Sequence, residues 1–274
     1  MSRDRGRTGR LRSNRDWEAW GRLDPLYGVA ALPGRSMAGA RPWTSSEFLE
    51  LGARDWDHFR PHWEQYGLSR ETCLEIGCGA GRMTAQLARE FDVVHGVDVS
   101  EEMIRLAARH VEPHVVRFYV SDGVHLPVAD SSVASVFSTH VFQHLGSVEA
   151  AAATFREIHR VLRVDGTLMI HLPIVSWPHG SAARAYRLAD RFRVRIGAGL
   201  ARARRFAHEK GLLKLPPMQM TSYDVDWLYR TLSELGFSDV EIRFLFGDSP
   251  MAIKHPFLFA RKVAPRSRLL AEGS

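Results

Sequence analysis

The sequence contains little cysteine, little lysine and no long apolar run, and each scarcity excludes a class of protein. Its 274 residues include two cysteines, Cys73 and Cys78, which lie five positions apart around a glycine-rich turn. Neither a disulfide framework nor a cysteine metal site is therefore expected. No apolar run reaches the ~18 residues that a membrane-spanning helix needs, and residues 11–30 lack the apolar region of a secretory signal. We expect a cytoplasmic protein with reduced cysteines and no membrane partner.

Arginine carries almost all of the basic charge. The formal net charge is +6, but only four of the 37 basic residues are lysines. Arginine dominance often reflects genome base composition, so it is weak support for a nucleic-acid partner. Residues 1–22 hold seven arginines against three acids. We expect residues 1–16 to form a disordered, solvated basic tail, with an arm for an anionic partner as the alternative, and residues 264–274 to form a second disordered tail.

The most informative segment, residues 73–82, reads CLEIGCGAGR. A short apolar strand ends near the acid Glu75, and three glycines follow at alternate positions, Gly77, Gly79 and Gly81. Glycines at such a turn let the backbone approach a ligand closely, and the helix that follows offers free N–H groups. The G-x-G-x-G spacing differs from the G-x-G-x-x-G of dinucleotide-binding turns, which argues against a nicotinamide oxidoreductase.

Two further acids follow the next two predicted strands. A strand over residues 92–97 leads into Asp98, 17 residues after Gly81. A carboxylate in that place can accept both hydroxyls of a ribose. A strand over residues 115–120 precedes Asp122, which could accept a hydrogen from the amino group of adenine. The glycine turn and the two acids together predict a site for an adenosine ligand with no phosphate requirement.

In these features the chain resembles the class I S-adenosylmethionine-dependent methyltransferases. The resemblance runs from about Thr72 to Ile170 and rests on five blocks in order. Two positions depart from the family pattern: residues 133–134 read VA where members usually have FD, and residues 164–166 read VDG where members have PGG. These departures predict changed loop geometry rather than lost binding. The five blocks are LEIGCGAG (74–81), GVDVS (96–100), DGVHLP (122–127), STHVFQHL (138–145) and RVLRVDG (160–166).

The resemblance implies a fold, a co-substrate and a set of contacts. The fold is α/β, a seven-stranded, mostly parallel, doubly wound sheet of the Rossmann-like methyltransferase type, whose last strand enters antiparallel between its neighbours. S-adenosyl-L-methionine is the implied co-substrate, held at its methionine portion by the glycine turn, at its ribose by Asp98 and at its adenine by the residues around Asp122. The implied cofactor-binding residues are Glu75, Gly77, Cys78, Gly79, Gly81, Asp98, Val99, Met103, Asp122, Gly123, Ser138 and Thr139.

A general base is expected near the end of the fourth or fifth strand, and histidine suits the task because it titrates near neutrality. The candidates are His144, His140 and His171, with His179 as a weaker fourth. His144 is preferred because it matches a histidine frequent in related sequences. The alternative for His144 is a structural residue at a helix start. No two histidines and a carboxylate share a ligand-like spacing on one element, so no metal is expected.

The length fits one domain with an insertion. The capping-box sequence TSSE at residues 44–47 predicts a helix to about Tyr66. This helix belongs to a helical segment over residues 17–66, which covers either the cofactor edge or the sheet alone. The stretch between Trp17 and Trp43 is expected to be irregular. The methyltransferase domain is expected over residues 67–263, with a helical lid inserted at about 173–220, where a segment after the fifth strand overhangs the ligand crevice. The lid's arginine stripe is either a solvated face or a contact for an anionic substrate or nucleic acid.

The preferred function is methyl transfer to oxygen, nitrogen or carbon of a small organic metabolite by in-line displacement. Aromatic residues such as Trp177 and Phe192 in the predicted lid suit an apolar or aromatic acceptor. One alternative is an RNA or protein methyltransferase, although the sequence lacks the Asn/Asp-Pro-Pro-Tyr/Phe block of many base-amino methylases, so a nucleic-acid partner is disfavoured. The second alternative is a regulator that binds the cofactor without turnover. Monomer and homodimer both stay open.

Overall fold

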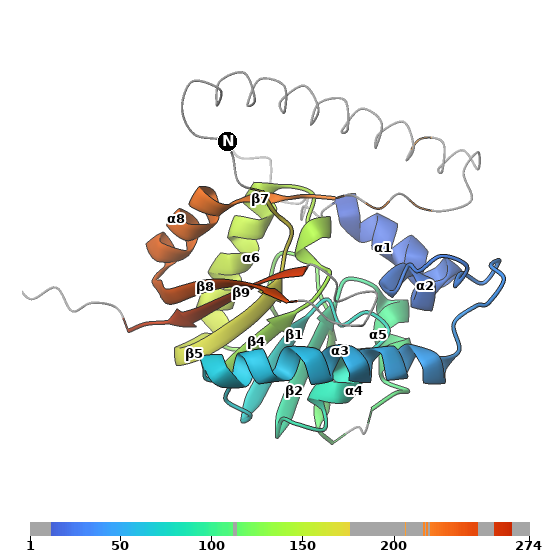
Figure 1. Ribbon diagram of the computed structural model, residues 1–274, viewed down its shortest axis with the longest axis horizontal. Coiled ribbons are helices and arrows are strands. Elements are labelled where there is room, and N and C mark those ends of the chain that lie inside the picture. Colours follow the sequence, from blue (N-terminus) through green and yellow to red (C-terminus); the bar gives the residue numbers. More distant parts are fainter. Residues whose placement is uncertain are drawn as a thin grey trace, which may run out of the picture.

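A seven-stranded sheet forms the centre of the protein in a computed structural model (Figure 1). The structure describes residues 12–111, 114–175, 220–245 and 255–264, together with residues 206, 216 and 218. The strand order is β3-β2-β1-β4-β5-β9-β8. The strands of this sheet are β1 (Thr72–Ile76), β2 (Val93–Asp98), β3 (Val116–Val120), β4 (Val133–Ser138), β5 (Leu162–His171), β8 (Phe237–Leu245) and β9 (His255–Lys262).

The direction of the strands confirms the predicted fold class. Strands β1 to β5 pair in parallel, as expected of strands joined by helical crossovers. Strand β9 enters antiparallel to both of its neighbours, with Met169 of β5 opposite Phe259. A separate two-stranded ladder joins β6 (Ile174–Val175) to β7 (Tyr223–Asp224).

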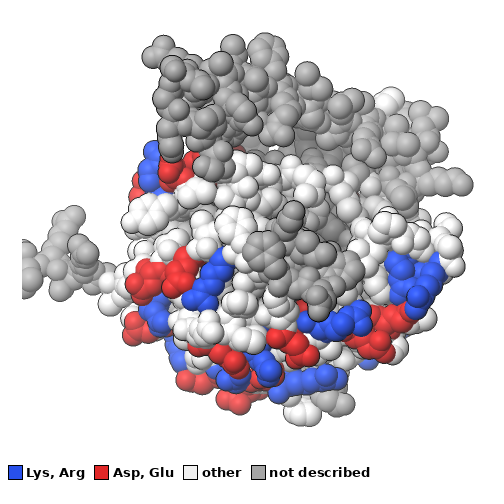
Figure 2. All heavy atoms as spheres, viewed as in Figure 1, with Lys and Arg blue, Asp and Glu red and all other residues white. Residues whose placement is uncertain are grey.

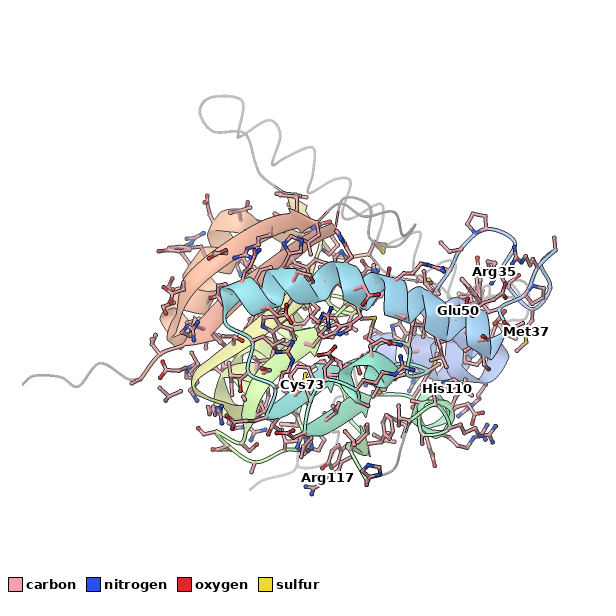
Figure 3. All side chains as sticks on the ribbon, turned by 60° about the horizontal axis from the view of Figure 1, so that its bottom comes forward. Arg35, Met37, Glu50, Cys73, His110 and Arg117 are labelled. Atoms are coloured by element: carbon pink, nitrogen blue, oxygen red, sulfur yellow. The ribbon has the colours of Figure 1, made fainter. Side chains whose placement is uncertain are left out.

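Helices cover both faces of the sheet because successive strand residues point to opposite sides. Leu74 and Val136 pack with helices α6 and α8 on one face, whereas Cys73 and Phe137 pack with α3 on the other. Figure 3 shows Cys73 between α3 and the sheet. The helices are α1 (Arg12–Leu23), α2 (Pro25–Val29), α3 (Ser45–Tyr66), α4 (Thr84–Leu87), α5 (Glu101–Ala107), α6 (Val148–Val161) and α8 (Val225–Leu235), with a 3-10 turn η1 (Phe142–His144).

The predicted capping box begins α3. Thr44 Oγ1 accepts a hydrogen bond from the Glu47 backbone N–H at 3.2 Å, and the Glu47 carboxylate accepts one from the Thr44 N–H at 3.3 Å. Arg35 and Arg41 contact the same carboxylate and lower the pKa of Glu47 to about 2. Gly67, with φ 110°, ends the helix in the left-handed conformation. Both ends of this helix can therefore be read from sequence.

The structure corrects the expected N-terminal boundary. Residues 12–16, predicted to be disordered, form the first turns of α1, and part of the stretch expected to be irregular is helical in α1 and α2. The reason is tertiary packing: Ser13, Asn14 and Asp16 are buried, and α1 lies against α5. Composition alone does not reveal such contacts.

Several expectations lie outside the described residues. They concern residues 1–11, residues 265–274, and most of the predicted lid, including its arginine stripe and His179. Among the residues that the structure describes, no helix has the length and apolar character needed to cross a bilayer. Both cysteines are free and buried.

Candidate functional site

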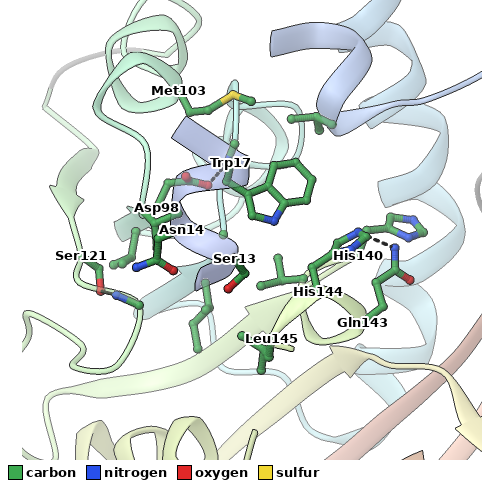
Figure 4. Close-up of a pocket in the computed structure, with 18 of the residues that line it drawn as sticks. Ser13, Asn14, Trp17, Asp98, Met103, Ser121, His140, Gln143, His144 and Leu145 are labelled. Carbon is green, nitrogen blue, oxygen red and sulfur yellow. Dashed lines mark hydrogen bonds between the residues drawn. The ribbon is translucent and has the colours of Figure 1, made fainter. Parts of the chain in front are cut away.

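A cavity of about 350 Å³ opens at the carboxyl ends of β1, β2, β3 and β4 (Figure 4). This is the edge at which open parallel sheets bind ligands. Helices α1 and α2 supply a further wall. The lining comprises Ser13, Asn14, Trp17, Gly28, Val29, Ala31, Leu32, Ile76, Gly77, Gly79, Val97, Asp98, Val99, Met103, Ser121, Gly123, Val124, His125, Leu126, Thr139, His140, Val141, Gln143, His144, Leu145, Thr154, Met218 and Met220.

The three predicted glycines divide between the cavity and the core. All three have positive φ, at 72°, 52° and 88° for Gly77, Gly79 and Gly81. Gly77 and Gly79 line the cavity, and a Cβ on Gly77 would lie 2.2 Å from Val141 Cγ2. Gly81 does not line it, and a Cβ there would lie 2.9 Å from Ala107 Cα in α5. The last glycine therefore serves helix packing, while the first two shape the cavity.

Asp98 lies in the cavity wall with its carboxylate held in place by the backbone. Oδ2 accepts a hydrogen bond from the Gly79 N–H and Oδ1 accepts one from the Ser100 N–H, both at 2.9 Å. Burial raises the pKa of Asp98. Each carboxylate oxygen has a second lone pair, so the group can still accept two hydroxyls of a ligand. Val99 and Met103, also predicted, line the same part of the cavity.

The structure places Gly123 at the cavity but turns the Asp122 side chain away from the lining. Asp122 Oδ1 accepts hydrogen bonds from the N–H groups of Val124 and His125 at 2.8 Å, and Oδ2 lies 2.8 Å from His125 Nδ1. The carboxylate thus organises its own loop. Gly123 lines the cavity with φ 82°.

The segment after β4 forms the wall opposite α1. Thr139 and His140 line the cavity, whereas Ser138 is buried and its Oγ donates to the Ile76 carbonyl at 3.0 Å. His140 has φ 60°, and its N–H donates to Nδ1 of His171 at 3.4 Å. His171, at the end of β5, is buried behind His140 and does not line the cavity.

His144 reaches the cavity from η1. Its Nε2 lies 3.0 Å from Nε2 of Gln143, the contact drawn as a dashed line in Figure 4. The indole of Trp17 meets the His144 ring edge-on at 5.0 Å between centroids. Of the three predicted histidines, His140 and His144 therefore face the cavity.

Two other predicted residues, Glu75 before the glycine turn and Cys78 within it, do not line the cavity. Glu75 is 2% exposed and accepts a hydrogen bond from Thr84 Oγ1 at 2.6 Å. Burial raises the pKa of Glu75 to about 7. Cys78 is also buried, and burial raises the pKa of its thiol.

The sequence reasoning expected a covering segment over residues 17–66 but missed Ser13 and Asn14, which it assigned to the disordered tail. Ser13, Asn14 and Val29 line the cavity, and Asn14 Nδ2 donates to the Asp122 carbonyl at 2.6 Å. No local pattern marks Asn14, since its partner lies 108 residues away. Within the described ranges, no group of three or more His, Cys, Asp or Glu is arranged to hold a metal ion.

Comparison with known proteins identifies the domain. Residues 74–170 match the family described as "Methyltransferase domain". Residues 74–170 are a methyltransferase domain. The matched range includes β2 to β4 and most of β1 and β5, and so contains the glycine turn, Asp98 and the wall after β4.

Relatives of the methyltransferase domain match only part of the chain. Phosphoethanolamine N-methyltransferase 2 of Caenorhabditis elegans is 32% identical over 104 residues, which are 36% of this chain and 23% of that protein. Malonyl-[acyl-carrier protein] O-methyltransferase of Hahella chejuensis is 36% identical over 108 residues, 37% of this chain and 38% of the relative. The alignments thus span well under half the length of these relatives.

A solved structure extends the likeness in fold beyond the methyltransferase domain match. Magnesium protoporphyrin IX methyltransferase from Synechocystis PCC 6803, with bound SAH, aligns with a TM-score of 0.56 at 16% identity. The alignment covers 91% of this chain and 99% of that one. At this identity it bears on the fold alone.

Proposed function

We propose that this protein transfers the methyl group of S-adenosylmethionine to oxygen, nitrogen or carbon of a small organic acceptor. The observation that carries the proposal is the convergence of four strand ends on one cavity of about 350 Å³, a volume within the ~300–1,000 Å³ range of small-molecule sites. The glycine turn after β1 and the carboxylate after β2 have the form that an adenosyl ligand needs.

The cofactor follows from the positions of Gly77, Gly79 and Asp98. The two glycines allow the methionine portion to pass close to the backbone, and Asp98, fixed by two N–H groups, accepts the ribose hydroxyls. Val99 and Met103 offer apolar surface to adenine. Glu75 supports the turn from below through Thr84.

His144 is the proposed general base for an acceptor that must lose a proton. In-line displacement requires the acceptor atom, the methyl carbon and the sulfur to be aligned. The base must also lie within hydrogen-bonding reach of the acceptor proton. His144 Nε2 is in contact with Gln143, so an acceptor hydroxyl or ammonium would replace the amide at that nitrogen. His140 is the second candidate, and His171 acts through it by accepting its backbone N–H.

Two observations favour a small acceptor over a polynucleotide. Helices α1 and α2 form part of the cavity wall, so a polymer would have to displace them. On the face shown in Figure 2, the described basic and acidic side chains lie next to one another. Among the described residues, several arginines pair with acids, such as Arg70 with Glu90 and Arg163 with Glu71. A polynucleotide surface would instead gather unpaired cations.

The test follows a labelled methyl group. The protein is incubated with methyl-labelled S-adenosylmethionine and with separated pools of small metabolites, RNA and protein. Label in the metabolite pool, reduced at least about a hundredfold by His144→Ala, supports the proposal. Label in RNA or protein contradicts the small acceptor, and bound but intact cofactor with every pool contradicts turnover.

A further inference from the structure

The side chain of Asn14 lies at one end of the cavity although it belongs to α1. Asn14 is 3% exposed and lines the cavity. Its Nδ2 donates to the Asp122 carbonyl at 2.6 Å. A Cβ on Gly123 would lie 2.8 Å from Asn14 Oδ1 and 2.9 Å from Nδ2, so the amide packs directly against the glycine. The missing side chain at Gly123 makes room for Asn14.

The polar groups of the neighbouring loop are engaged with one another. Both Asp122 carboxylate oxygens accept hydrogen bonds from within the loop. The Gly123 N–H donates to Ser121 Oγ at 3.0 Å, and that hydroxyl donates to the His125 carbonyl at 2.9 Å. The loop therefore engages most of its own donors and acceptors, and the Asp122 side chain does not line the cavity.

The orientation of the Asn14 amide is fixed by its partner. With Nδ2 on the Asp122 carbonyl, a reversed amide would bring two acceptor oxygens together, which is unfavourable. Oδ1 consequently stays on the other side of the group. Figure 4 shows it turned toward the cavity. The hydrogen bond that the structure shows for this side chain is the one donated by Nδ2, so the lone pairs of Oδ1 can accept a hydrogen bond from a ligand.

We infer that Asn14 Oδ1 accepts a hydrogen bond from the 6-amino group of adenine, and that this side chain, not the carboxylate of Asp122, selects the adenine base. The inference rests on the proposed function, because it assigns part of the adenosyl site. Adenine offers an N–H donor at this position, whereas a 6-oxo purine offers an acceptor. A 6-oxo base would therefore bring its oxygen against Oδ1 while the amide is held in place by Asp122.

The test compares two ligands that differ at this position. Calorimetry gives the dissociation constants of S-adenosylhomocysteine and S-inosylhomocysteine, its 6-oxo analogue, for the wild type, Asn14→Ala and Asp122→Asn. The wild type should prefer the adenosyl ligand by at least about tenfold. In the complex with S-inosylhomocysteine the hydrogen bond to Asn14 Oδ1 is lost, and the 6-oxo oxygen faces that acceptor. Asn14→Ala should reduce that preference to less than about threefold, mainly by weakening S-adenosylhomocysteine.

Asp122→Asn is the control for the loop fold, because an asparagine oxygen can still accept the N–H groups of Val124 and His125. Asp122→Ala removes the side-chain acceptor altogether. Both variants should keep the wild-type preference. Undiminished binding of S-inosylhomocysteine by Asn14→Ala would show that its site is folded, and Asn14→Ser should repeat the loss of preference. A preference that survives in Asn14→Ala, or is lost only in the Asp122 variants, would overturn the inference alone. A wild type that binds neither ligand would overturn the proposed function as well.

Discussion

Arg82 of the glycine turn forms an ion pair with Asp55 of α3, and both side chains are almost completely buried, at 2% and 0% exposure. Helix α3 approaches the turn closely at this point, since a Cβ on Gly52 would lie 2.4 Å from the Arg82 carbonyl oxygen. The pair connects the helix that precedes the domain match to the segment that would hold the cofactor. The N-terminal region thus supports the site as well as covering the sheet.

Asp55→Ala should destabilise the protein by about 3–5 kcal/mol, because it leaves the Arg82 guanidinium buried without its partner. Urea unfolding measures the loss. The double variant Asp55→Ala/Arg82→Met should recover a substantial part of it, since no uncompensated charge then remains. Equal stability of Asp55→Ala and the wild type would contradict the structural role of the pair.

Gly77→Ala should abolish binding of an adenosyl ligand and destabilise the fold. The substitution forces a non-glycine residue into φ 72° and places its Cβ 2.2 Å from Val141 Cγ2. Left-handed backbone costs ~1–2 kcal/mol, and overpacking adds ~1–3 kcal/mol. Gly34→Ala is a matched control, because Gly34 has φ 74° and nothing within 4 Å of the added Cβ. Gly34→Ala should lose only the stability that the left-handed backbone costs, and it should bind the adenosyl ligand normally. Similar losses in both variants would show that the contact with Val141 is unimportant.

Glu75→Gln should change how stability depends on pH. Burial raises the pKa of Glu75 from 4.5 to about 7, so between these values the folded protein keeps a proton that the unfolded chain has released. The stability that the protonated Glu75 carboxyl contributes to the fold is fully present below about pH 4.5 and is lost as the pH rises through about 7. Each pH unit in this window should lower the free energy of unfolding by up to ~1.4 kcal/mol.

Urea unfolding of both proteins at several pH values checks this. The free energy of unfolding of Glu75→Gln, relative to that of the wild type, should rise by up to about 3 kcal/mol between pH 5 and pH 8, because glutamine cannot ionise. The glutamine side-chain oxygen can still accept the hydrogen bond from Thr84. A difference that stays constant over this range would show that the Glu75 carboxyl keeps an ordinary pKa.

Trp17 should report ligand binding through its fluorescence. Its indole lines the cavity and lies 5.0 Å from the His144 ring, so an adenosyl ligand would change its surroundings. Titration with S-adenosylhomocysteine should change the emission of the wild type, and Trp17→Phe should remove most of the change. Trp227→Phe, a substitution in α8 away from the cavity lining, should retain it. The opposite pattern in the two variants would argue against a cavity closed by α1.

The sheet and its cofactor turn could be predicted because their signals are local. Strands β1, β2 and β4 are short, mostly apolar runs. The turn is marked by glycines, and the capping box of Thr44 and Glu47 marks the start of α3. The antiparallel β9 followed from the resemblance, since no local feature of residues 255–262 fixes its direction. Element ends were less accurate: the strand expected over residues 92–97 runs over Val93–Asp98.

The part of the cavity wall built by residues 12–16 could not be predicted, because it depends on contacts between distant parts of the chain. Asn14 belongs to an arginine-rich, glycine-containing stretch whose composition favours disorder, yet it is buried against a loop 108 residues away. Asp122 illustrates the reverse case. Its position after a strand predicts a ligand contact, whereas in the structure its carboxylate contacts the N–H groups of its own loop and His125 and does not line the cavity.

The most direct test of the account is calorimetric binding of S-adenosylhomocysteine to the wild type and to Asp98→Ala. The account predicts micromolar binding by the wild type, at least about tenfold weaker in the variant, because the variant loses the charged acceptor for the ribose hydroxyls. NADH should not bind. Absence of S-adenosylhomocysteine binding, or equal affinity in the two proteins, would contradict the assignment of this cavity to an adenosyl ligand.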